Sequence, residues 1–429
     1  MARPPKTPKI NHGGNRTRMD GLDDHMLTQI LFRLPNCKTV LACSPVNKRW
    51  CSLISDPTFS AQFTNHKKKI TTLLKGSGSG SDHEDDEAHW NLIATMQSSQ
   101  QWVPLITKFM FGFRELSLEF LPCKTCTTTV TFKDLVLCSN YWTYQEHGRL
   151  VYYITNPITK QWVALPPCPV YKHRWEQERI KRTALICQQP YIDSSQHYKF
   201  RVVEVRNTCI DSSQETLGLV VYCSEIGEWK EINLRVPKEE FRQLETTVVC
   251  NGIIYFKSGL SLVGLDPFDV NDTCDTTLEA RVMPPLPDFG CLQESSGQLL
   301  IINSPKRCSK TFVCYSEDRR VIELEMEMWK LDLNQARLAW EMTFRGVCKG
   351  TWKGRQLQRN IALEGDLIEV HPYNDKLIYM FLPTKDWFVL CDTQTGYITP
   401  LKSVHRYSLS RIHRLEHQWW PTSVPALVQ

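Results

Sequence analysis

The 429-residue sequence has no apolar run long enough to cross a bilayer, which takes about 18–20 residues. Its first residues, MARPPKTPKI, lack the apolar stretch of a secretory signal. An excess of positive charge is also missing, because 51 basic and 46 acidic residues leave a formal net charge of only +5. We therefore expect no membrane or nucleic-acid partner, a location in the nucleus, the cytoplasm or both, and 17 cysteines that are mostly small buried thiols.

Sequence motifs of catalysis are absent as well. There is no nucleophile elbow, no zinc-protease motif, no P-loop and no dinucleotide fingerprint. Cys123-Lys-Thr-Cys126 has the spacing of a zinc or redox site, but no second pair follows and the neighbouring sequence is β-rich. The loosest histidine group, His405, His413 and His417, lies among basic residues and is typical of a solvated surface. The sequence predicts no enzyme, no cofactor and no metal site.

Composition divides the chain into four regions. Residues 1–18 are rich in Pro, Gly and basic residues without periodicity, which predicts a disordered basic tail. Residues 19–65 carry short helical patterns. Residues 66–88 change from basic to Gly/Ser-rich to acidic, and the Gly/Ser tract in the middle predicts a flexible linker. Residues 89–429 contain many short β-rich runs bounded by turn residues, which predicts an all-β domain.

A loose repeat narrows the choice among all-β folds. Each copy is an apolar strand, a polar turn and an aromatic residue that begins a second strand; the aromatic residues are Trp162, Trp229, Trp340 and Tyr397. The copies recur at a spacing near the roughly 50-residue period of kelch repeats, or at twice that spacing. This predicts a kelch-like β-propeller of about six blades, with five to seven open, in which one blade combines strands from both ends of the domain.

The repeated aromatic residues have two interpretations. They form a stacking platform for sugars or bases, or they pack between blades, and their position in a repeated turn favours packing. Pro166-Pro167 and Pro284-Pro285 are interpreted as breakers at strand ends. Trp419 and Trp420 are either anchors at the seam of the ring or a surface patch.

The segment GLDDHMLTQILFRLP, residues 21–35, predicts a short amphipathic helix. Asp23 or Asp24 can cap its N-terminus, and Pro35 ends it. One apolar stripe runs along the helix, namely Leu27, Ile30, Leu31 and Leu34.

Two further short helices are predicted, over residues 38–43 and 46–54. Ser44 is expected to cap the last one with Pro45 in its first turn, and Asp56-Pro57 is expected to close it. A unit this small cannot bury all its apolar side chains internally, so we expect part of them to form a docking surface.

At this point residues 22–59 resemble an F-box. The pattern Leu-x4-Leu-x2-Ile-Leu-x-Arg-Leu-Pro runs from Leu22 to Pro35, and Val-x-Lys-Arg-Trp follows from Val46 to Trp50. The β-rich remainder is similar to the kelch-like F-box-associated domains of plant F-box proteins, most clearly in NPITKQWVALPP. The chain departs from the F-box pattern at Asp23, where many members have proline, and at Pro45, which interrupts a stretch that is usually helical.

The resemblance implies a three-helix F-box that docks on a Skp-type adaptor and, through it, on cullin and RING subunits. The protein is then a non-catalytic substrate receptor of an SCF-type ubiquitin ligase whose propeller captures a target protein. The residues that the resemblance assigns to the core and the adaptor-binding surface of the F-box are Leu22, Leu27, Ile30, Leu31, Leu34, Pro35, Leu41, Val46, Trp50, Leu53 and Ile54.

Two other hypotheses stay open. The first is a propeller scaffold with a degenerate F-box that no longer engages a ligase, which Pro45 favours. The second is a propeller enzyme, which predicts acidic, His or metal-ligating residues converging on the central channel.

Overall fold

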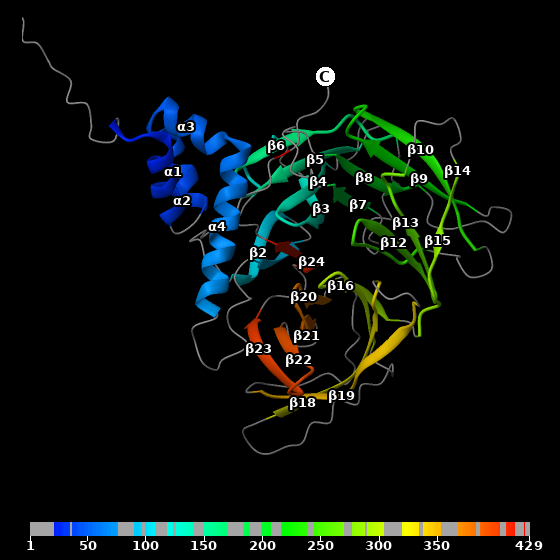
Figure 1. The fold of residues 1–429 in the computed structure, drawn as a ribbon. Coiled ribbons are helices and arrows are strands. Elements are labelled where there is room, and N and C mark those ends of the chain that lie inside the picture. The colour runs from blue at the N-terminus through cyan, green and yellow to red at the C-terminus, as the bar shows by residue number, and fades with distance from the viewer. Residues whose placement is uncertain are drawn as a thin grey trace, which may run out of the picture. The chain divides into compact units, whose positions relative to one another are not determined.

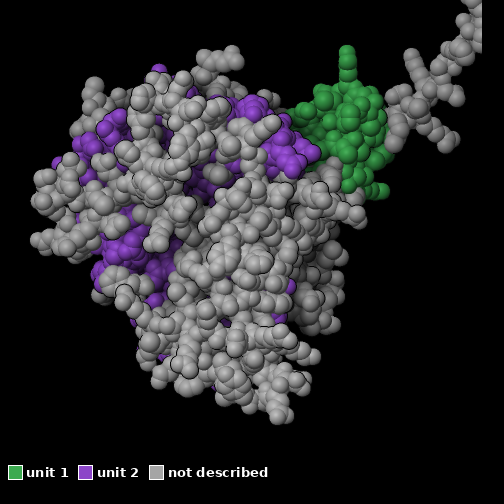
Figure 2. Space-filling model, turned by 180° about the vertical axis from the view of Figure 1, so that it is seen from behind, with its two compact units in different colours: residues 1–79 green, residues 80–429 purple. Residues whose placement is uncertain are grey.

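The computed structural model divides the chain into two compact units, residues 1–79 and residues 80–429, coloured separately in Figure 2. No helix in the described residues is long and apolar enough to span a membrane. The structure describes residues 21–34, 37–75, 90–96, 99–107, 118–122, 126–140, 150–169, 183–188, 199–206, 216–237, 244–269, 277–287, 290–303, 320–333, 338–352, 368–382, 387–403, 409–416 and 424.

The described part of the first unit is helical. Its elements are α1 (Asp24–Arg33), α2 (Cys37–Ala42), the 3₁₀ turn η2 (Ser44–Val46), α3 (Lys48–Ser55) and α4 (Pro57–Lys75). Asp23 caps α1, since the backbone N–H of Met26 donates to Asp23 Oδ1 at 2.7 Å. The helix ends at Arg33, and Leu34 after it is extended, as the residue before a proline tends to be. The short helix that the sequence predicted in residues 21–35 is therefore confirmed.

The third helix starts two residues later than the sequence predicted. Ser44, Pro45 and Val46 form the 3₁₀ turn η2, and Asn47 caps α3 by accepting a hydrogen bond from the backbone N–H of Trp50 at 2.9 Å. The prediction that Ser44 caps this helix is therefore wrong. Pro45 lies in the tight turn before α3 and leaves the hydrogen bonds of that helix intact.

Asp56-Pro57 begins a fourth helix instead of only ending the third. The backbone N–H of Thr58 donates to Asp56 Oδ1 at 2.7 Å, and Pro57 occupies the first helical position, where a missing N–H costs nothing. Because α4 continues to Lys75, residues 66–75 are helical and the predicted start of the linker at residue 66 is wrong. The described part of the unit has four α-helices where three were expected. Residues 76–88 and the tail 1–18 lie outside the described residues.

The second unit is built from β-sheets whose strands are mostly antiparallel (Figure 1). One sheet contains β3 (Cys126–Phe132), β4 (Leu135–Asn140), β5 (Val151–Asn156) and β6 (Gln161–Ala164). The next contains β7 (Thr183–Cys187), β8 (Phe200–Val205), β9 (Thr216–Cys223), β10 (Glu228–Arg235) and β14 (Thr277–Glu279), the last pairing in parallel with β10. A third contains β11 (Thr246–Cys250), β12 (Ile253–Ser258), β13 (Ser261–Leu265) and β15 (Arg281–Val282).

An eight-stranded sheet follows, made of two antiparallel halves. The first half is β16 (Cys291–Ser295), β17 (Gln298–Asn303), β18 (Arg320–Leu331) and β19 (Trp340–Trp352). The second half is β20 (Ile368–His371), β21 (Asn374–Leu382), β22 (Trp387–Asp392) and β23 (Tyr397–Ser403). The halves meet at one parallel pair, Lys349 with Tyr397.

The remaining sheet joins strands from the two ends of the unit. β1 (Trp90–Met96) pairs with β2 (Ser99–Thr107) on one side and with β24 (Leu409–Glu416) on the other. The prediction that one sheet combines strands from both ends is confirmed.

The inner strands of the β unit contact one another in a closed cycle. β3 contacts β7, and the contacts continue through β11, β16, β20 and β24 back to β3. Figure 1 shows the sheets arranged around this common centre. The arrangement is that of a β-propeller, in which closure leaves few exposed sheet edges.

The turns of the predicted repeat share one backbone feature. Lys160, Gly227 and Gly396 have φ values of 58°, 72° and 73°, and each lies one or two residues before the aromatic residue of its copy. The run VTFKDLVLC, residues 130–138, forms a hairpin of β3 and β4, in which Lys133 turns the chain with a φ of 54°.

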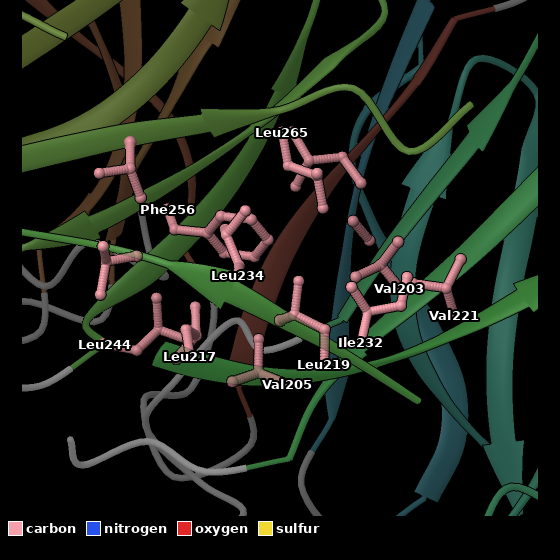
Figure 3. Packing of buried hydrophobic residues seen from close by; sticks show 14 of the residues in the cluster. Val203, Val205, Leu217, Leu219, Val221, Ile232, Leu234, Leu244, Phe256 and Leu265 are labelled. Carbon is pink, nitrogen blue, oxygen red and sulfur yellow. The ribbon is translucent and has the colours of Figure 1, made fainter. Parts of the chain in front are cut away.

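Apolar cores lie between successive sheets. The largest joins strands β7–β10 to β12 and β13, where the side chains of Val203, Leu219, Leu234, Phe256 and Leu265 face one another (Figure 3). Similar clusters connect the first sheet to the second, the third sheet to β16–β18, and the two halves of the eight-stranded sheet. Because the second and third sheets bury side chains on both of their faces, their strands are nearly continuous in apolar residues.

Candidate functional site

Four of the residues assigned to the F-box are in the core of the helical unit. Leu27 and Leu31 have no exposed surface, and Trp50 and Ile54 are buried. The sequence analysis missed other core residues, namely Phe32, Cys37, Val40, Phe59 and Phe63. The ring of Phe32 lies 5.2 Å from that of Phe59 and 6.1 Å from that of Phe63. The spacing of Phe59 and Phe63 is a helical signal that appears once Asp56 is recognised as a helix cap.

The other assigned residues keep accessible surface. Those that are half-buried are Leu22, Ile30, Leu34, Leu41 and Leu53. Val46 is 61% exposed, and Met26, which the sequence analysis did not single out, is 49% exposed. Pro35 lies outside the described residues.

A stripe along α1 explains how these residues are arranged. Met26, Ile30 and Leu34 are spaced by four residues, so they follow one another along the same side of the helix. They lie next to the buried positions Leu27 and Leu31, one residue further along the chain. We call Met26, Ile30 and Leu34 the outer stripe of α1, an apolar strip that the helical unit leaves partly uncovered.

Cationic side chains hold α1 at both ends. Arg49 on α3 contacts Asp24 Oδ1 at 2.6 Å and donates to the carbonyl oxygen of Leu22 at 2.5 Å. Lys67 on α4 donates to the carbonyl oxygen of Leu34 at 2.6 Å, and burial lowers the pKa of its ammonium group. A cation near the C-terminal carbonyls also suits the helix dipole. These contacts fix the direction in which α1 presents its outer stripe.

In the β unit, two of the repeated tryptophans pack between sheets. The indole N–H of Trp229 donates to the carbonyl oxygen of Pro166 at 2.8 Å, and that of Trp340 donates to Pro284 at 3.2 Å. The packing interpretation and the strand-end prolines are confirmed at these positions. Trp162 and Tyr397 differ, since they are 42% and 68% exposed. Trp419 and Trp420 lie outside the described residues.

A cavity of about 530 Å³ lies among the inner strands, lined by residues of β3, β7, β11, β16, β20 and β24. His413, expected at a solvated surface, is instead 4% exposed and lines this cavity because β24 is an inner strand. Its neighbour Arg414 contacts Glu416 at 3.0 Å and Glu369 at 3.7 Å, and it also pairs with Glu294. Burial tends to lower the pKa of Arg414, but the three carboxylates outweigh it and raise the pKa above its usual value.

Acidic residues and a histidine therefore converge on the channel, as the propeller-enzyme hypothesis predicts. The three carboxylates, Glu294, Glu369 and Glu416, all form ion pairs with Arg414. A structural role therefore accounts for their presence, because the Arg414 guanidinium connects β16, β20 and β24. Of the zinc-like Cys123-Lys-Thr-Cys126 motif, Cys126 is disulfide-bonded and Cys123 lies outside the described residues. The described cysteines that are buried and form no disulfide are Cys37, Cys138, Cys168, Cys223, Cys250, Cys348 and Cys391.

Comparison with known proteins matches residues 119–416 to the family described as F-box protein At3g26010-like, beta-propeller. F-box protein At5g07610 of Arabidopsis thaliana is 26% identical over 335 residues, which cover 72% of this chain and 69% of the relative. F-box protein At3g26010 of the same plant is 22% identical over 85% of this chain and 75% of its own length. Among solved structures, a chain of the nidogen/laminin complex superposes with a TM-score of 0.37 at 10% identity, over 77% of this chain and 99% of that one.

Proposed function

Because the chain belongs to the At3g26010-like family of F-box β-propeller proteins, we propose that it is the substrate-recognition subunit of an SCF-type ubiquitin ligase. The helical unit docks on a Skp-type adaptor, which connects it to cullin and RING subunits. The β unit holds a target protein, and the receptor acts by raising the concentration of that target near the ubiquitin-loaded enzyme. The receptor itself is non-catalytic and works in the nucleus, the cytoplasm or both.

One observation carries the proposal, the outer stripe of α1. Three apolar side chains keep accessible surface in a unit that buries Leu27 and Leu31 completely. Burying a large apolar side chain is worth about 1.5–3 kcal/mol, so a partner that covers the stripe gains substantial free energy. The contacts of Arg49 and Lys67 support docking further, because a helix held at both ends loses little entropy when it binds.

We also propose that the propeller has six blades. Support comes from the six inner strands in their closed cycle and from the eight-stranded sheet, whose halves share only the pair Lys349 and Tyr397. Each half then counts as one blade, and β24 with β1 and β2 makes the blade that closes the ring.

Co-purification of the full chain with a Skp-type adaptor tests the proposed function. Ile30→Asp places a charge on the outer stripe, and we expect it to reduce adaptor capture at least tenfold. Gln29→Asp is the matched control, because the neighbouring Gln29 is exposed and lies outside the stripe. Leu31→Asp is unsuitable for this purpose, since Leu31 has no exposed surface and a charge there unfolds the unit.

Either of two results overturns the docking proposal. In one, wild-type protein fails to capture the adaptor; in the other, Ile30→Asp captures it as well as Gln29→Asp does. The first result supports the scaffold with a degenerate F-box. That alternative rested on Pro45, which the 3₁₀ turn η2 accommodates without disturbing α3.

A further inference from the structure

The cavity among the inner strands has the size of a small-molecule site. Its volume of about 530 Å³ falls in the range of roughly 300–1,000 Å³ that such sites occupy. The ion pairs of Arg414 account for the acidic residues in its lining. The question is therefore what the remaining polar groups of the lining do.

Gln293 on β16 turns an unused acceptor toward the cavity. The residue is 4% exposed, and its side-chain amide nitrogen donates to the carbonyl oxygen of Ile368 at 3.0 Å. Its side-chain oxygen accepts no hydrogen bond in the described part of the chain, yet protein atoms do not seal it off. Since Gln293 lines the cavity, this oxygen faces the open space.

Lys133 provides a second group for a ligand. It makes no ion pair with the residues that the structure describes, and its ammonium nitrogen lies 5.6 Å from the centre of the Phe132 ring. Thr247 on β11 also belongs to the lining, but its hydroxyl oxygen has no accessible surface and is not available to a ligand.

These groups define what fits. The lining offers an acceptor at Gln293 and a donor at Lys133. The charged side chains around the cavity, two cations against three carboxylates, leave it with one net negative charge, which disfavours an anion. We propose that this cavity binds a small, neutral, hydroxyl-rich molecule of the size of a monosaccharide or cyclitol. Ligand hydroxyls donate to Gln293 and accept from Lys133.

Saturation-transfer NMR on the full chain tests this, with D-glucose and myo-inositol as probes and D-gluconate as the anionic comparison. We expect transfer to at least one neutral probe and none to gluconate. Gln293→Leu and Lys133→Met should each weaken binding about three- to tenfold, the value of one hydrogen bond.

Gln298→Leu is the control for Gln293→Leu, because Gln298 lies on the neighbouring strand β17 and does not line the cavity. Thermal unfolding reports whether Gln293→Leu still folds without its bond to Ile368. The proposal is overturned if wild-type protein transfers magnetisation to neither neutral probe, if gluconate binds better than both, or if Gln293→Leu and Lys133→Met bind as well as wild type. None of these results depends on the adaptor experiment.

Discussion

The two units of this protein use their apolar side chains differently. The described part of the helical unit has one small core, in which Phe32 of α1 meets Phe59 and Phe63 of α4, and it leaves the outer stripe of α1 partly uncovered. The β unit has a separate core between most neighbouring sheets. Truncating a core side chain should therefore destabilise every helix of the first unit. In the second unit it should destabilise only the sheets that share the affected core.

A matched pair of substitutions gives the largest expected effect. Leu31→Ala and Leu219→Ala each remove a leucine with no exposed surface, at a cost of about 3 kcal/mol. We expect Leu31→Ala to unfold all of α1–α4, because a unit this small is marginally stable. Leu219→Ala should loosen only β7–β10, β12 and β13. Hydrogen–deuterium exchange of the full chain, followed peptide by peptide, measures both.

The contrast fails if Leu31→Ala raises exchange in α1 alone, or if Leu219→Ala raises exchange throughout the β unit. Val46→Ala is the control in the helical unit, because Val46 is 61% exposed and its truncation creates no cavity.

An acid-sensitive contact in the β unit gives the second prediction. Burial tends to raise the pKa of Glu225, but hydrogen bonds and charge from Arg201, which is buried, lower it to about 2. The folded pKa is below the unfolded value of about 4.3, so this stabilisation is complete above that pH and is lost as the pH falls toward 2. Glu225→Gln should cost about 2 kcal/mol at pH 7 and flatten the pH dependence below pH 5.

Urea unfolding of the β unit between pH 7 and pH 2.5 measures this slope. A variant whose stability falls with pH as steeply as that of wild type would contradict the assignment. Glu228→Gln is the control, because Glu228 is exposed and the described ion pairs of Arg201 are with Glu225 instead.

The smallest expected effect is a difference in stability between substitutions in two copies of the repeat. Trp229→Phe removes the indole donor that bonds to Pro166, at a cost of about 1 kcal/mol. Trp162→Phe should change stability by less than about 0.5 kcal/mol, because that side chain is 42% exposed and its indole bonds to no acceptor in the described region. Urea midpoints measure both variants, and equal midpoints would mean that the bond to Pro166 contributes nothing.

Local patterns predicted the β unit well. Apolar runs between turn residues identified most strands, and the recurring turn before Trp162, Trp229 and Tyr397 identified the repeat. The pairing of β24 with β1 was also predictable, because an open ring would expose two strand edges. The lining of the cavity could not be predicted from the sequence. Gln293, Thr247 and Arg414 are far apart in the chain, and no local pattern distinguishes an inner strand from an outer one.

The helical unit was harder to predict for a different reason. An Asp-Pro pair such as Asp56-Pro57 is found both where helices end and where they begin. Here only the spacing of the aromatic residues that follow indicates that a new helix, α4, begins. The stripe from Leu27 to Leu34 was visible, but periodicity could not separate the fully buried Leu31 from the half-buried Ile30. That distinction depends on where α3 and α4 pack, which is a tertiary property.

The pairing of β24 with β1 has a consequence for biosynthesis. A ribosome completes β1 about 300 residues before it completes β24, which at roughly 5–20 residues per second is a delay of about 15–60 s. During that interval the edge of β1 that later binds β24 has no partner, while the intervening sheets can already form. A nascent chain in this state exposes a strand edge that invites misassembly until β24 has emerged and paired with β1.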